Sequence, residues 1–214
     1  MSARDNILSR IRAANAARPT DAGSQVTAER LAAHPRGPLP TMAWEPLQQF
    51  IDCSIAAAST LDQVDNREAV PAAVARYLKK NDLPMHGVCW PELGDLDWRG
   101  SGLEMQARSA LGDDKVGVTG SYCALAETGT LVLLSGEEQH ATTSLLPETH
   151  VAVVSKRRIV ASMEDVWELL RKEVGKLPRQ VNFVSGPSRT ADIEMTLVYG
   201  AHGPFRVHII ITDD

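Results

Sequence analysis

The segment Val116-Gly-Val-Thr-Gly-Ser-Tyr-Cys-Ala-Leu-Ala-Glu-Thr-Gly-Thr-Leu-Val-Leu-Leu-Ser135 begins and ends with a short apolar run, at residues 116–119 and 130–135. Two further runs of this kind occupy residues 151–155 and 181–185. Nearly continuous apolar runs of this length are typical of strands buried on both faces, as in a mainly parallel sheet covered by helices. These four runs therefore predict buried strands of such a sheet.

Helical and strand patterns alternate around these runs, which favours an α/β fold. Ser162 and Asp165 form a capping-box pattern ahead of an apolar helix. Asn66 is placed to begin another helix, which runs to about Lys80. We predict a three-layer α/β/α sandwich with a mixed, mainly parallel sheet. The remaining predicted elements are a helix over residues 47–58, strands over 60–64 and 86–90, and a final strand over 205–212.

Residues 1–46 differ in composition from the rest of the chain. Asp5 is placed to cap a helix, and Ile7 and Ile11 share one face, which predicts a docked amphipathic helix. The arginines of this stretch also resemble those of a transit peptide. Residues 19–46 are rich in Pro, Gly and small polar residues, which predicts a Pro-rich linker. The predicted domains are thus an N-terminal helix and linker over 1–46 and a globular domain over 47–214.

The overall composition argues against several classes of protein. The chain has 214 residues and a formal net charge of -5, whereas a nucleic-acid surface needs clustered Lys and Arg. No apolar run approaches the ~18 to 20 residues that span a bilayer. Cys53, Cys89 and Cys123 lack the spacing of a zinc site, an iron–sulfur cluster or a disulfide framework. A reducing, cytoplasmic location is therefore expected.

The segment between residues 117 and 130 is the first that could carry chemistry. It contains neither G-x-G-x-x-G nor a Walker loop. Gly120 permits a turn with free backbone N–H groups, and Glu127 is followed by Thr128 and Thr130. A carboxylate beside hydroxyl groups is a candidate base or nucleophile if burial raises its pKa. The alternative is that Glu127 braces the turn into the next strand.

The second segment is Ser185-Gly-Pro-Ser-Arg-Thr-Ala-Asp-Ile-Glu194. Its pattern predicts a strand end and a glycine turn, with Ser188 or Thr190 capping a helix whose N-terminus would face an anion. Arg189 adds a planar guanidinium that suits a carboxylate or phosphate, although it could instead pair with acidic residues of the first turn. The predicted ligand-binding residues here are Ser185, Gly186, Ser188, Arg189, Thr190 and Asp192.

The third segment, residues 199–204, joins that predicted helix to the last strand. Gly200 suits a helix C-cap, and His202 is a candidate general acid or base in a loop. If the last two strands are parallel, however, His202 lies at the opposite sheet edge from Ser185 and Arg189. A shared site then needs an antiparallel final strand or a symmetric partner. No ligand spacing for a metal ion is recognisable, so no metal site is predicted.

Five motifs in order resemble those of the LUD domain, and more closely those of the lactate utilization protein C (LutC/YkgG) family. They are Gly117-Val-Thr-Gly120, Ala126-Glu-Thr-Gly-Thr130, Leu146-Pro147 with His150, residues 185–194 and His202-Gly-Pro204. The resemblance covers the chain from about Phe50 onward. It implies a fold similar to glucosamine-6-phosphate deaminase, ribose-5-phosphate isomerase and CoA-transferases.

The resemblance also implies a role in bacterial oxidation of L-lactate to pyruvate, beside the iron–sulfur lactate utilization proteins A and B. This chain lacks the cysteine clusters of the B-type member, so no cofactor is expected in it. The leading hypothesis is an accessory subunit with a pocket for a small carboxylate or phosphate. The alternatives are a stand-alone enzyme of the sugar-isomerase or CoA-transferase kind, with Glu127 as base or nucleophile, and a non-catalytic ligand-binding regulator.

Overall fold

A computed structural model describes residues 2–16, 21–193 and 195–214, and it describes no side chain at 21–24, 192 or 193. The chain divides into two compact units, Met1–Pro40 and Thr41–Asp214. Within the described ranges, no helix is long and apolar enough to cross a membrane.

The described residues of the first unit form helices α1 (Ala3–Ala16) and α2 (Asp21–Ala33). A helix is present at α1 as predicted, with Ser2 as its N-cap, and none of its residues is buried, so its docking stays a prediction. The Asp5 carboxylate accepts from the Ser2 backbone N–H at 3.0 Å, and the Ser2 hydroxyl accepts from the Asp5 N–H at 3.2 Å. The region of α2 was wrongly predicted as linker, because its Ala, Glu, Arg and Leu are good helix formers while the prolines cluster after it.

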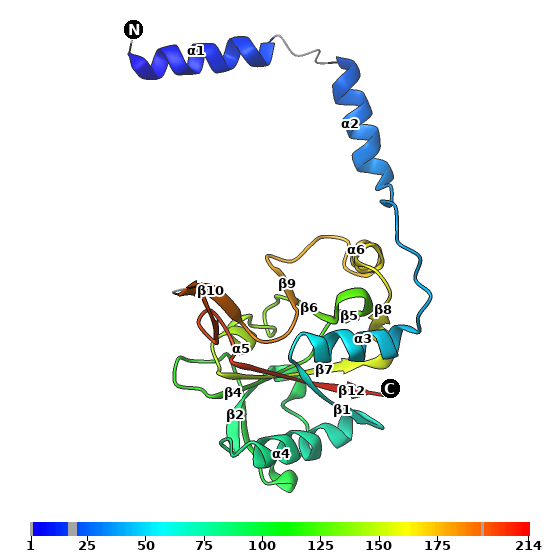
Figure 1. Cartoon of the computed structure of the whole chain (residues 1–214), viewed down its shortest axis with the longest axis vertical. Coiled ribbons are helices and arrows are strands. Elements are labelled where there is room, and N and C mark those ends of the chain that lie inside the picture. Colours follow the sequence, from blue (N-terminus) through cyan, green and yellow to red (C-terminus); the bar gives the residue numbers. More distant parts are fainter. Residues whose placement is uncertain (1, 17–20, 194) are drawn as a thin grey trace. The chain divides into compact units, whose positions relative to one another are not determined.

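The main sheet of the second unit has six strands, and every neighbouring pair in it is parallel. Its centre coincides with two of the apolar runs, at β4 and β7, and the final strand β12 pairs with β7 along its whole length (Figure 1). In spatial order the strands are β1 (Thr60–Val64), β12 (Arg206–Thr212), β7 (Thr149–Ser155), β4 (Val116–Thr119), β2 (His86–Cys89) and β3 (Glu104–Ala107).

A second sheet of four strands contains the other two apolar runs. Two of its pairs, β5 with β6 and β6 with β9, are antiparallel, and the third is parallel. The predicted α/β fold with a mainly parallel sheet is confirmed, and the antiparallel pairing lies in this separate sheet. In spatial order its strands are β8 (Ile159–Val160), β5 (Cys123–Leu125), β6 (Thr130–Leu134) and β9 (Val181–Val184).

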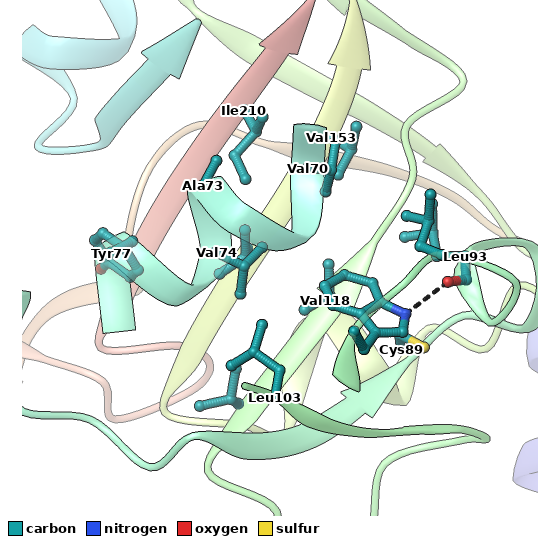
Figure 2. Close-up of a cluster of buried hydrophobic side chains, with 14 of the residues drawn as sticks. Val70, Ala73, Val74, Tyr77, Cys89, Leu93, Leu103, Val118, Val153 and Ile210 are labelled. Carbon is teal, nitrogen blue, oxygen red and sulfur yellow. Dashed lines mark hydrogen bonds between the residues drawn. The ribbon is translucent and has the colours of Figure 1, made fainter. Parts of the chain in front are cut away.

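The apolar core forms between these layers. On one face of the main sheet, helix α4 (Val70–Lys80) packs Val70 and Val74 against Val118 and Ile210 (Figure 2). On the other face, Ala152, Val154 and Ile209 pack against helix α3 (Pro46–Ala56) and the second sheet. Helix α6 (Met163–Glu173) covers the outer face of the second sheet and carries the predicted capping box of Ser162 and Asp165. Thus the second face of the main sheet is covered largely by strands.

The helix predicted after Ser188 is wrong, because this stretch is a β-hairpin. Strands β10 (Arg189–Ile193) and β11 (Thr196–Tyr199) pair antiparallel around Met195, which has φ 55°. The β-branched and aromatic residues of these strands favour extended backbone. Gly200, at φ 77°, is in a bend after the hairpin and does not cap a helix. The expected helix N-terminus for an anion is therefore absent here.

Candidate functional site

Three of the predicted ligand-binding residues form a chain of hydroxyl groups at one end of the second sheet. The Thr130 hydroxyl lies 2.7 Å from that of Thr128 and 2.6 Å from that of Ser185. The pairing of Leu131 with Val184 brings the start of β6 beside the end of β9. Thr130 is buried, while Thr128 and Ser185 are exposed. The turn between β5 and β6 and the end of β9 thus form one polar surface.

Glycines let this surface lie close against α3. A Cβ atom on Gly129 would meet the Ser54 nitrogen at 2.4 Å, and one on Gly186 would meet the Ala57 carbonyl oxygen at 2.1 Å. Both glycines have positive φ, 63° and 79°. Gly186 therefore serves a close backbone approach that no other residue type permits without movement.

Glu127 lies in the short 3₁₀ helix η4 (Ala126–Thr128) beside this surface. Its backbone N–H donates to the Ala161 carbonyl at 3.1 Å, and its carbonyl accepts from the Cys53 thiol at 3.6 Å. These contacts suit the bracing role, while the half-buried side chain leaves a chemical role as a prediction.

The loops that contain Ser188 and His202 meet at the amino end of β12. The Ser188 N–H donates to the Pro204 carbonyl at 2.9 Å, and the His202 N–H donates to the Ser188 hydroxyl at 3.3 Å. The expected separation of these loops depended on a helix between them. A hairpin instead returns the chain to its starting point, so the two motifs are neighbours. The His202 side chain is exposed.

The other predicted residues of this segment lie on the hairpin. Arg189 is exposed and Thr190 is buried. The side chain of Asp192 is outside the described residues, as is Glu194. Among the described residues, no group of three or more His, Cys, Asp or Glu side chains is arranged to hold a metal ion.

A cavity of about 380 Å³ adjoins the contact between the two loops, and we call it the amino-edge pocket. Arg206, the first residue of β12, is the charged side chain in its described lining. Sequence reasoning treated Arg206 only as a strand residue. The available signal was a cation two residues after the end of the His202-Gly-Pro204 motif. The lining includes the side chains of Thr60, Tyr77, Asn81, Tyr199, Phe205 and Arg206.

Burial and the Arg206 charge set the electrostatics of this pocket. Burial raises the pKa of Tyr77, and a hydrogen bond from Thr60 and the charge of Arg206 partly oppose that rise. His208 stacks on Tyr77, with ring centroids 3.9 Å apart, and its Nδ1 lies 2.9 Å from the Thr60 hydroxyl. Burial lowers the pKa of His208 to about 4, so this ring is neutral at pH 7. Arg206 is thus the source of positive charge in the described lining.

Gly120 lies apart from both groups, at the carboxyl end of β4. A Cβ atom there would come within 2.0 Å of a Glu92 carboxylate oxygen. The predicted site residues therefore occupy three places: the hydroxyl chain, the loops at the amino end of β12, and the carboxyl edge of the main sheet.

The fold resembles that of a solved structure. A protein of the DUF162 family from Deinococcus radiodurans superposes with a TM-score of 0.59 at 23% identity, covering 81% of this chain and 99% of that one. At this identity the match shows a shared fold.

Sequence relatives carry the name lactate utilization protein C. The protein from Geobacillus sp. (strain WCH70) is 43% identical over 102 residues, covering 46% of this chain and 42% of the relative. The protein from Bacillus subtilis (strain 168) is 37% identical over 133 residues, covering 58% of this chain and 54% of the relative. The chain spans about half the length of such relatives. The predicted resemblance is confirmed.

The pattern of the LUD domain matches residues 91–212, which is more than half of the chain. The match includes β4, the second sheet, the hairpin and β12. The chain belongs to the LUD domain family.

Proposed function

We propose that this protein acts in lactate utilization, as an accessory subunit of a cytoplasmic system that oxidises L-lactate to pyruvate. Iron–sulfur partners, lactate utilization proteins A and B, would accept the electrons, and this chain would contribute no redox cofactor of its own. The observation that carries the proposal is the similarity to proteins named lactate utilization protein C. Cys53, Cys89 and Cys123 are free thiols, in keeping with a reducing compartment.

The ligand that we propose for the amino-edge pocket is a small carboxylate such as L-lactate or pyruvate. A guanidinium binds a carboxylate through two parallel hydrogen bonds, and Arg206 offers one beside Tyr77 and Phe205. Thr60 and Asn81 add polar groups, and the volume suits a small molecule. The Ser188 and His202 loops would hold the wall that Pro187 forms.

Replacing Arg206 tests the pocket. Arg206→Gln should weaken L-lactate binding by about 10- to 100-fold, since a charge-assisted hydrogen bond contributes roughly 1.5 to 3 kcal/mol. Calorimetric titration of L-lactate, pyruvate and phosphate into the whole chain measures the effect. Arg189→Gln tests the arginine that the sequence predicted for this role, and Arg179→Gln is the matched control on an exposed arginine. Unchanged affinity in Arg206→Gln would remove the pocket from the proposal.

The cellular role needs a separate experiment. Deleting the gene should abolish growth on L-lactate but not on pyruvate, and Arg206→Gln should restore growth poorly compared with the wild-type chain. Co-purification with the iron–sulfur partners tests the assembly directly. Normal growth of the deletion strain on L-lactate would contradict the accessory role.

A second candidate function is a stand-alone enzyme that uses Glu127. The observation in its favour is the hydroxyl chain of Thr128, Thr130 and Ser185 that begins one residue after Glu127. Turnover of sugar phosphates or acyl-CoA by the isolated chain, lost in Glu127→Gln, would support it. Ligand binding without turnover, and with growth on L-lactate unaffected, would instead indicate a regulator.

A further inference from the structure

The connections after β2 and β4 leave the main sheet on opposite faces. These two strands are parallel neighbours. The chain after β2 enters the short helix η2 (Pro91–Leu93), where Leu93 packs with α4. The chain after β4 enters β5, where Ala124 packs on the side of α3. Diverging connections of this kind open a crevice at the carboxyl ends of parallel strands, where α/β proteins commonly bind ligands.

A cavity of about 320 Å³ lies at this place, and we call it the carboxyl-edge crevice. Its lining comes from the segments after both strands, from the end of β6 and the loop after it, and from the segment after α6. The lining includes Trp90, Glu92, Ser121, Tyr122 and Gln139.

The Glu92 carboxylate is held across the crevice. The Gln139 amide donates to it at 3.2 Å, and Gly120 leaves the space that one of its oxygens occupies. Arg67 pairs with Asp95 at 2.6 Å and also donates to the Glu92 carbonyl, which anchors η2. Because Gly120 has no side chain, the Glu92 carboxylate can approach the end of β4. This close approach explains why a glycine ends the Gly117-Val-Thr-Gly120 motif.

The other groups are polar but uncharged, or already paired. The buried Ser121 hydroxyl has no hydrogen-bond partner among the described residues. The Trp90 indole donates to the His140 carbonyl at 3.0 Å, and the Tyr122 hydroxyl donates to Glu173 at 2.9 Å. Both aromatic residues thus line the cavity with their polar atoms already paired, and Ser121 offers an unused hydroxyl group.

We propose that the carboxyl-edge crevice is a second ligand site, which takes a small hydroxylated molecule with no negative charge. Hydroxyl groups of such a ligand would donate to the Glu92 carboxylate and exchange a hydrogen bond with Ser121. Its carbon skeleton would lie against Trp90. An anion is disfavoured because Glu92 is the charged residue of the described lining. This site therefore differs in ligand chemistry from the amino-edge pocket and does not depend on the function proposed there.

Matched sugars test the charge requirement. D-glucose, D-glucosamine and D-glucuronate would be titrated into the whole chain, with the indole N–H resonance of Trp90 as the readout. We expect saturable shifts with D-glucose and D-glucosamine at millimolar concentrations, and at least about 10-fold weaker binding of D-glucuronate. No saturable shift with either of the first two, or equal binding of D-glucuronate, overturns the proposal.

Variants test whether the sugars bind in the carboxyl-edge crevice. Glu92→Gln keeps the side-chain size and removes the charge, so the discrimination against D-glucuronate should disappear. Ser121→Ala should weaken D-glucose binding several-fold, and Arg206→Gln should leave it unchanged. Binding of D-glucose that survives both Glu92→Gln and Ser121→Ala unaltered also overturns the proposal. Urea unfolding of each variant separates lost binding from lost folding.

Discussion

The two edges of the main sheet carry pockets of opposite charge. At the amino edge, Arg206 provides a positive charge in a cavity to which Pro187, from the motif at residues 185–194, contributes one wall. At the carboxyl edge, Glu92 provides a negative charge in a crevice between diverging strand connections. The first pocket depends on a hairpin that returns the chain, and the second on strand order. A single parallel sheet can therefore present two chemically distinct surfaces, each created by the segments that enter or leave its strands.

The largest expected effect comes from Gly186, which joins the hydroxyl chain to the amino-edge pocket. Gly186→Ala places a Cβ atom at positive φ and against the Ala57 carbonyl, so the unfolding free energy should fall by about 2 to 4 kcal/mol. Urea denaturation measures the change. Gly112→Ala is the matched control, because a Cβ atom there meets nothing within 4 Å. Equal stability of the two variants would contradict the packing argument.

The next effect is a loss of folding stability in acid. We expect it from His208, whose ring stacks on Tyr77 of the amino-edge pocket. The pKa of His208 is about 4 in the fold and near 6.5 when unfolded. The unfolded state therefore takes up the proton first. The stabilisation that comes from keeping His208 neutral in the fold is complete above pH 6.5. It is lost as the pH falls towards 4, and the total loss of unfolding free energy is about 3 kcal/mol.

Unfolding of the wild type and His208→Gln at pH 7 and pH 4.5 measures this loss. The variant should lose less stability on acidification than the wild type. His150, whose pKa burial also lowers to about 4, keeps its own contribution in both proteins. The same pH dependence in both proteins would show that His208 does not carry the effect.

A smaller effect is expected from the hydroxyl chain. Thr130→Val keeps the shape of the side chain but removes its hydrogen bonds to Thr128 and Ser185. Those two residues are exposed, so water can replace the lost partner. The unfolding free energy should fall by only about 1 kcal/mol. A loss of unfolding free energy as large as that of Gly186→Ala would mean that the chain of hydroxyl groups organises the site.

The smallest expected effect is the dependence of ligand affinity on salt, which should differ between the two pockets. Raising the ionic strength from about 0.01 M to 0.15 M should weaken L-lactate binding about two- to threefold, because salt screens a partly exposed charge pair. D-glucose binding at the carboxyl-edge crevice should not change. Parallel titrations at both salt concentrations measure this difference. Equal salt dependence would remove the electrostatic contrast between the edges.

Local patterns predicted the regular elements well. The strand at residues 60–64 and the Ser162–Asp165 capping box appear where expected, because each depends on neighbouring residues alone. The segment after Ser188 failed because Ser and Thr suit both a helix cap and an extended strand, and tertiary context decides between them. Thr128, Thr130 and Ser185 were predicted as site residues, but their shared hydrogen bonds depend on the pairing of β6 with β9.

The sequence by itself determined the α/β class, most of the strands and the resemblance to the LUD domain family, because apolar periodicity and short motifs are local properties. Only the tertiary structure decided which motifs meet. It brought Ser188 to His202 through a hairpin, placed Arg206 at one sheet edge, and set Glu92 over Gly120 at the other. These contacts join residues that are distant in the chain, and strand order and turn geometry determine them.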